Sequence, residues 1–188
     1  MNKFYKVIRV ATVPPIMAAA LFILLGAYGI ISFIDSLLGV LFIGVLPILS
    51  YPLQRFIPYY KDKGRDGQRN LAIVFSVLGY ILGCVLALIF QAPLNTVLFI
   101  YLDYLISGIL IAVFNKLFHL KASGHACGIV GPVAMLLYFG LYLPAIIGAI
   151  LIVLVFISSI GMKRHTFLQL LGGSAITLSA LLLLSFFF

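Results

Sequence analysis

The sequence predicts an all-α integral membrane protein, a bundle of about seven (six to seven) transmembrane helices in a single domain of 188 residues. Three observations support this prediction. First, 64% of the residues are hydrophobic and only 9% are charged, whereas soluble domains carry about a quarter charged residues. Second, the apolar residues form runs long enough to cross a hydrocarbon core of ~30 Å, which takes ~20 helical residues. Third, the basic residues gather in short segments between those runs.

The first apolar run contains no charged residue and extends from Val10 to Ile34. It follows three basic residues, but it is longer than the apolar part of a signal peptide. We therefore predict a first transmembrane helix over residues 10–34. The same length criterion predicts three further helices over residues 36–53, 71–90 and 93–114.

The stretch from Ala126 to Met162 also lacks charge and is too long for one helix. Gly140 and Pro144 lie near its middle, where they favour a turn. Two antiparallel helices are therefore predicted, together with a last one at the C-terminus; their ranges are 123–140, 142–162 and 166–188.

With seven spans, the N-terminus lies on the same side of the membrane as three segments: 54–70, 115–125 and 162–166. The other side then has the C-terminus and three turns, at Asp35, Gln91–Pro93 and Gly140. All twelve Lys and Arg residues fall on the first side. Basic residues are enriched in cytoplasmic loops. We therefore expect a prokaryotic plasma membrane, with the N-terminus and the basic face in the cytoplasm and the C-terminus outside.

The net charge of +8 also indicates the class of partner. In a soluble protein it would suggest nucleic acid, but basic loops between membrane spans favour anionic lipid headgroups instead. The two cysteines, Cys84 and Cys127, form neither a disulfide framework nor a metal motif. We expect an anionic lipid partner, no nucleic acid, no metal and no cofactor, and the sequence leaves a homo-oligomer open.

The histidines are the candidate catalytic residues. All three of them, His119, His125 and His165, fall on the predicted basic face, and histidine suits proton transfer or nucleophilic attack near neutral pH. Gln169 follows His165 by four residues, close enough on a helix to hydrogen-bond the imidazole. The alternative is an interfacial histidine in the headgroup region without a chemical role.

The residues before His125 suggest a phosphate site. Ser123 and Gly124 directly precede an apolar helix, whose first N–H groups are free to bind an anion. The serine hydroxyl adds a donor and the glycine permits close approach. The alternative is that Ser123 only caps the helix.

These segments resemble the type 2 phosphatidic acid phosphatase (PAP2) superfamily of membrane phosphatases over roughly residues 50–175. The family's second block, PSGH, is similar to Ala122–His125. Its third block, SR-x5-H-x3-D, resembles Ser158–Gln169, and small residues follow in both. The first block, K-x6-RP, would fall within Lys61–Asn70, with Arg69 as its arginine and the lysine, Lys61 or Lys63, left open.

The resemblance implies a PAP2-like helical core and a metal-independent phosphatase acting on a lipid or polyprenyl phosphate monoester. In that family's mechanism His165 would be the nucleophile, His125 would protonate the leaving alkoxide, and Gln169 would support His165. The phosphate would be held by Ser123, Gly124, Lys63, Arg69 and Arg164.

Two departures from the family pattern keep alternatives open. Ser159 replaces the third-block arginine, which removes a bidentate phosphate ligand; Lys163 or Arg164 could substitute. Gln169 replaces the aspartate, which removes a charge that stabilises an imidazolium. One alternative is a catalytically impaired PAP2-fold protein that binds anionic lipid or a partner. Another is an unrelated small transporter using Asp103, a carboxyl midway along the fourth helix; that carboxyl could equally be packed and hydrogen-bonded.

Overall fold

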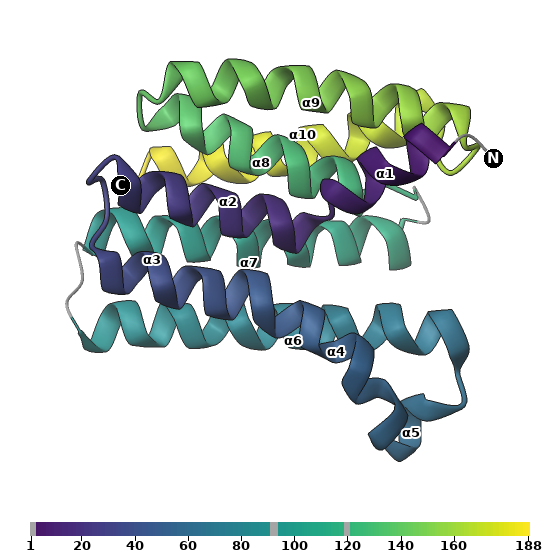
Figure 1. Ribbon diagram of the computed structural model, residues 1–188. Coiled ribbons are helices and arrows are strands. Elements are labelled where there is room, and N and C mark those ends of the chain that lie inside the picture. Colours follow the sequence, from purple (N-terminus) through teal and green to yellow (C-terminus); the bar gives the residue numbers. More distant parts are fainter. Residues whose placement is uncertain (1–2, 91–93, 119–120) are drawn as a thin grey trace.

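A computed structural model of the protein describes residues 3–90, 94–118 and 121–188. Within these ranges the chain forms helices joined by turns, without a strand (Figure 1). Five helices are long and apolar enough to cross a membrane, and a bent pair near the N-terminus brings the number to six. The predicted all-helical class is confirmed. The predicted turn at Gln91–Pro93 and the residue His119 lie outside the described residues.

The five candidate spans run roughly parallel or antiparallel through the bundle (Figure 1). The first is a continuous unit in which a short π-helical segment, Val40–Val45, joins α3 to α4. The bounds of the helices in these spans are α3 Phe33–Gly39, α4 Leu46–Leu53, α6 Gly64–Ile89, α7 Leu94–Lys116, α9 Tyr142–Gly161 and α10 Phe167–Ser185.

The structure corrects the first predicted helix, 10–34. The chain instead forms α1 (Lys3–Ala11) and α2 (Pro14–Ala27), which meet at a bend of 50°. Proline lacks an N–H and disfavours a helical conformation in the residue before it, so the pair at the start of α2 breaks the run. α2 ends early because Gly29, with φ of 70°, turns the chain towards α3.

The structure also corrects the third predicted helix, 71–90, because α6 begins seven residues earlier, at Gly64. Hydropathy marks only the part of a helix that lies in hydrocarbon, and the extension is polar. Much of the predicted loop 54–70 is therefore helical, with a short 3₁₀ turn and α5 (Pro58–Lys61) before α6. Buried Gln54 fixes this turn by donating to the carbonyls of Tyr60 at 2.8 Å and Gly64 at 2.9 Å.

α8 (Gly124–Tyr138) is the central helix of the bundle and packs against α2, α9 and α10 (Figure 1). At ~1.5 Å per residue, its 15 residues are shorter than the hydrocarbon thickness. Most of its side chains are buried. Gly140, where the sequence indicates a turn, has φ of 76° and separates α8 from α9.

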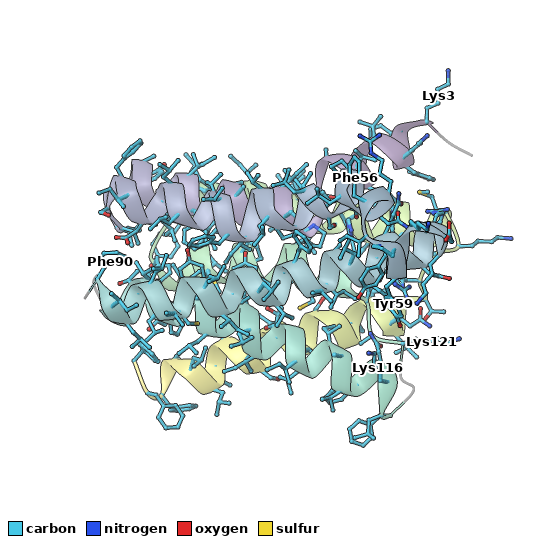
Figure 2. All side chains as sticks on the ribbon, turned by 90° about the horizontal axis from the view of Figure 1, so that it is seen from below. Lys3, Phe56, Tyr59, Phe90, Lys116 and Lys121 are labelled. Carbon is cyan, nitrogen blue, oxygen red and sulfur yellow. The ribbon has the colours of Figure 1, made fainter. Side chains whose placement is uncertain are left out.

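The bundle has two different ends. Figure 2 places Lys3, Lys116 and Lys121 at one end and Phe90 at the other. The first and last described residues also lie at opposite ends (Figure 1). Between the ends, large apolar side chains on α6 and α9 are exposed, which suits a lipid environment. We call the end that holds the lysines the basic end.

Candidate functional site

The candidate site lies at the basic end, where α8 begins beside the turn between α9 and α10. The backbone N–H of Ser123 donates to the backbone carbonyl of Gln169 over 2.9 Å. Gly173 of α10 packs directly against the Ser123 backbone, and a Cβ at that glycine would collide with it. The second and third sequence blocks are therefore joined in space.

Ser123 sets the direction in which α8 begins. It is fully buried, and its Oγ accepts from the N–H of Ala126 at 3.3 Å. The preceding carbonyl, that of Ala122, accepts from Asn115 Nδ2 at the end of α7 over 3.0 Å. An α-helix leaves the N–H groups of its first residues without helical partners, so those of Gly124 and His125 remain for an anion. Open space surrounds the Cα of Gly124, which leaves room for one.

The tautomer of His125 is fixed by a hydroxyl from the bend between α1 and α2. His125 is buried, and its Nε2 lies 3.2 Å from Thr12 Oγ1. That hydroxyl gives its single proton to the carbonyl of Ile8 over 2.8 Å. Nε2 must therefore carry the proton and donate to Thr12, which leaves the lone pair of the neutral ring on Nδ1.

The charge state of His125 follows from its surroundings. Burial lowers the pKa of His125 to about 4, and the positive charges of Arg9 and His165 contribute in the same direction. The ring is consequently neutral at pH 7. The backbone bond between Ser123 and Gln169 holds the segments that carry His125 and His165 side by side at the basic end.

His165 has the opposite tautomer. It lies half-buried in the turn before α10, with its Nδ1 3.2 Å from Gln169 Oε1. That atom also accepts from the N–H of Thr166 at 3.3 Å, so it is the amide oxygen. His165 Nδ1 therefore donates, and Nε2 keeps a lone pair suited to nucleophilic attack. The hydrogen bond expected from the four-residue spacing is present.

The pKa of His165 is lowered. Burial is the largest cause, and the charges of Arg9 and Arg164 act in the same direction, whereas the hydrogen bond to Gln169 raises the pKa. The neutral, nucleophilic form of the ring is thus favoured near neutral pH.

Arg9 is a candidate phosphate-binding residue that the sequence analysis missed. It projects from α1, is half-buried, and its Nη1 is buried without a hydrogen-bond partner in the described part of the chain. Burial, followed by the charges of Arg164 and Arg65, lowers the pKa of Arg9. No carboxylate among the described residues forms an ion pair with these guanidinium groups. Like charges held together in this way create a strong field for an anion.

Two sequence-predicted phosphate ligands lie differently from expectation. The ammonium of Lys63 lies 3.2 Å from the ring centroid of Tyr59, a cation–π contact on α5. Arg69 is exposed on α6. None of the described interactions joins either residue to the two histidines. The basic residue of this segment that lies near Arg9 is Arg65, in the first turn of α6.

The other third-block residues have separate roles. The backbone N–H of Arg164 donates to the carbonyl of Ser159 over 3.0 Å, which ends α9, while its charge acts on both Arg9 and His165. Ser159, at the family's arginine position, is fully buried, and its Oγ has no hydrogen-bond partner within the described ranges. The structure thus brings together Ser123, Gly124, His125, Arg164, His165 and Gln169, and it adds Arg9, Thr12 and Arg65.

The arrangement combines groups that can take part in phosphoryl transfer. One imidazole presents a lone pair, a second belongs to the segment bonded to it, and the charges of Arg9 and Arg164 act on the nucleophile. In the described residues no group of three or more His, Cys, Asp or Glu side chains is placed to hold a metal. Comparison of the chain with protein-family models, with curated proteins and with solved structures finds no match.

Proposed function

We propose that the protein is a PAP2-like membrane phosphatase, which hydrolyses a lipid or polyprenyl phosphate monoester through a histidine nucleophile. The observation that carries this proposal is the backbone bond between Ser123 and Gln169, which brings the segments of His125 and His165 together, with opposite tautomers and with a guanidinium nitrogen of Arg9, unpaired among the described residues, at the same end. The chain order of the SGH and histidine blocks supports the same assignment.

The phosphate group would bind at the N-terminus of α8. The N–H groups of Gly124 and His125 would donate to its oxygens, and Arg9 would approach from α1. A dianion there would relieve the repulsion among Arg9, Arg65 and Arg164. Arg9 can form the bidentate bond that the family's third-block arginine provides and Ser159 cannot. An N-terminal residue would in this way compensate for a substitution in the third block.

In the first chemical step, His165 Nε2 would attack phosphorus. The bond from phosphorus to the lipid oxygen breaks, which gives a phosphohistidine and a lipid alkoxide. His125 Nδ1 would protonate the alkoxide, having gained a proton when the bound dianion raised its pKa. Water would then attack the phosphohistidine and lose a proton to His125, which releases inorganic phosphate and restores His165.

The position in the membrane follows from the charge distribution. Because basic residues mark cytoplasmic segments, we place the basic end in the cytoplasm of a prokaryotic cell. Substrate would enter from the cytoplasmic leaflet, with its phosphate among the arginines and its tail in the bilayer.

The deciding experiment is phosphate release by purified protein from a panel of lipid phosphates, comprising a phosphatidate, a phosphatidylglycerophosphate and a polyprenyl phosphate. Wild type should release phosphate from at least one of them and should be inhibited by vanadate. The His165→Ala variant should fall to background, while the exposed Lys6→Gln variant retains the wild-type rate. Equal background rates for wild type and His165→Ala would refute the enzyme proposal.

A second candidate is a catalytically impaired protein that binds the same lipid phosphates. Gln169, the hydrogen-bond partner of His165, is neutral and cannot stabilise an imidazolium by charge, which favours this second candidate. This candidate predicts saturable binding of lipid phosphate, dependent on Arg9, without phosphate release.

A further inference from the structure

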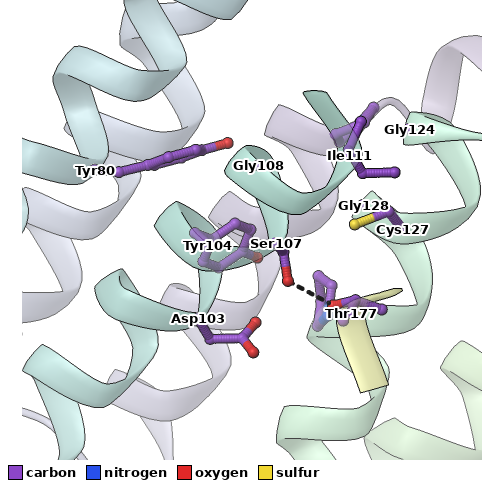
Figure 3. A pocket seen from close by; sticks show the side chains of 13 residues that line it. Tyr80, Asp103, Tyr104, Ser107, Gly108, Ile111, Gly124, Cys127, Gly128 and Thr177 are labelled. Atoms are coloured by element: carbon purple, nitrogen blue, oxygen red, sulfur yellow. Dashed lines mark hydrogen bonds between the residues drawn. The ribbon is translucent and has the colours of Figure 1, made fainter. Parts of the chain in front are cut away.

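A second polar site lies deep in the bundle between α6, α7, α8 and α10 (Figure 3). It is a cavity of about 120 Å³ whose lining includes Asp103, Tyr104, Ser107 and Thr177. Asp103 precedes Asn115, the α7 residue bonded at the phosphate site, by twelve residues. At ~1.5 Å per residue it is ~18 Å further into the bundle. Gly124 of the phosphate site also lines this cavity, but the carboxyl lies too deep to touch a phosphate bound there.

Asp103 has no counter-charge in this cavity. Its side chain is 2% exposed, and Oδ1 has no hydrogen-bond partner within the described residues. A carboxylate at this depth is costly unless a cation or a proton neutralises it. Neither lysine nor arginine lines the cavity.

Two hydroxyl groups converge on the same space. Ser107 lies four residues after Asp103, one turn along the same face of α7. Its Oγ is 3.4 Å from Thr177 Oγ1 of α10, which is long for an O–H···O bond. The Cys127 thiol also hydrogen-bonds to both hydroxyls, and each hydroxyl oxygen has two lone pairs, so one remains for a cation. Figure 3 shows the side chains of Asp103, Ser107 and Thr177 pointing towards one another.

A backbone carbonyl adds a fourth oxygen. Pro132 lies inside α8 and lacks an N–H, so the carbonyl of Gly128 loses its helical donor. Both residues line the cavity. α8 thus carries a backbone acceptor without a helical donor at a residue of the cavity wall.

We propose that this cavity binds one sodium ion, coordinated by the Asp103 carboxylate, the hydroxyls of Ser107 and Thr177, the Gly128 carbonyl and water. Oxygen donors of this kind select hard cations. A single carboxylate balances one positive charge, whereas a divalent cation would leave an excess charge in a low-dielectric interior. A proton alone would neutralise Asp103 without requiring three further oxygens around it.

The ion would join the helices that carry the phosphate site. Asp103 and Ser107 belong to α7, Gly128 to α8 and Thr177 to α10. The same three helices carry the phosphate site at the basic end, through Asn115 of α7, the N-cap Ser123 of α8 and Gln169 of α10. Sodium would therefore stabilise the bundle and act at a distance from the reacting groups.

The test uses the full chain, purified without lipid phosphate, so that its result is independent of any phosphatase activity. Wild type should bind radioactive sodium saturably at one ion per chain. It should also unfold at a higher temperature in sodium chloride than in choline chloride of equal ionic strength. Asp103→Asn should lose both effects, and Asp62→Asn, which alters an exposed carboxylate of the basic end, should keep them.

A second variant decides the matter if Asp103→Asn fails to fold. The double substitution Ser107→Ala with Thr177→Val keeps the carboxylate and should weaken sodium binding at least tenfold. The proposal is wrong if wild type shows no saturable sodium binding, or if the double variant binds sodium as tightly as wild type. A wild-type melting temperature that responds to pH but not to sodium would identify a protonated carboxyl and would likewise overturn it.

Discussion

Ser123 donates its backbone N–H to the backbone carbonyl of Gln169 over 2.9 Å, and this bond joins the two segments that carry the histidines. The contact depends on Gly173, which lies against the Ser123 backbone with no room for a side chain. Small residues at helix contacts in membranes allow this close approach. The relative position of His125 and His165 therefore rests on a hydrogen bond and a glycine, both outside the reacting groups.

The first prediction concerns this contact. Gly173→Ala should push α10 away from the start of α8, lower the free energy of unfolding by about 1–3 kcal/mol and reduce phosphate release. Gly172→Ala is a matched control, because its Cβ would lie 3.8 Å from that of Ala122, an ordinary contact. Thermal unfolding and phosphate release of the two variants should differ clearly; equal behaviour would contradict the contact.

The second prediction distinguishes Arg9 from the basic residues of the first block. Arg9→Gln should lower kcat/KM by about 100-fold, the scale of a lost charge-assisted bond to phosphate. Lys63→Ala should change it little, because that ammonium contacts Tyr59. Measuring kcat/KM for both variants with the best lipid phosphate checks the assignment. A larger loss with Lys63→Ala would show that the first-block lysine binds phosphate instead.

The third prediction concerns Thr12 as a positioning residue. Thr12→Val removes the acceptor of His125 Nε2–H, so the ring can adopt either tautomer. We expect kcat to fall by about tenfold with little change in KM, a part of the ~10²- to 10⁴-fold that a general acid or base contributes, because the ring is retained and only its tautomer is freed. Thr12→Ser should restore the rate, which separates a hydrogen-bonding role from packing. A wild-type kcat in Thr12→Val would exclude the role.

The fourth prediction is the pH dependence. Burial and nearby charge lower the pKa of His165 below its ordinary value, and only the neutral ring attacks. The rate should therefore rise with pH through the lowered pKa of His165 and fall again at higher pH, where His125 loses the proton that it gives to the alkoxide. Arg9→Gln removes a positive neighbour, so the acidic limb of kcat/KM should move to higher pH. An unmoved limb would mean that another group limits the rate.

The same shift affects folding. A histidine whose pKa is lower in the folded state binds protons more readily when unfolded, so stability is full above ~6.5 and declines as the pH falls. This applies to His165 and more strongly to His125, with its pKa of about 4. Melting temperatures between pH 7 and pH 4 should fall less in His125→Gln than in wild type.

The sequence predicted the features that depend on local composition. Apolar runs gave the helical class, and Gly140 marked a turn that the structure has between α8 and α9. The prediction of one first helix was wrong because hydropathy does not detect the bend that Pro14 and Pro15 impose. The predicted start of α6 came too late in the chain because hydropathy does not detect the polar first turns of this helix.

Site prediction divided along similar lines. Short motifs indicated Ser123, His125 and Gln169, and the partners of Ser123 and Gln169 are close in the chain or in the neighbouring block. Thr12 contacts His125 across 113 residues, a tertiary contact that no local pattern reveals. The three-residue spacing of Lys3, Lys6 and Arg9 was the only available signal of a separate basic helix.

The amide oxygen of Gln169 has two partners with different purposes. It accepts from the N–H of Thr166 to cap α10, and it holds the ring of His165. A substitution that removes this oxygen therefore changes reactivity and the start of the last helix together. Glutamate retains both acceptor contacts, so it is the substitution through which a lineage could recover a charged partner for the histidine while keeping the helix intact.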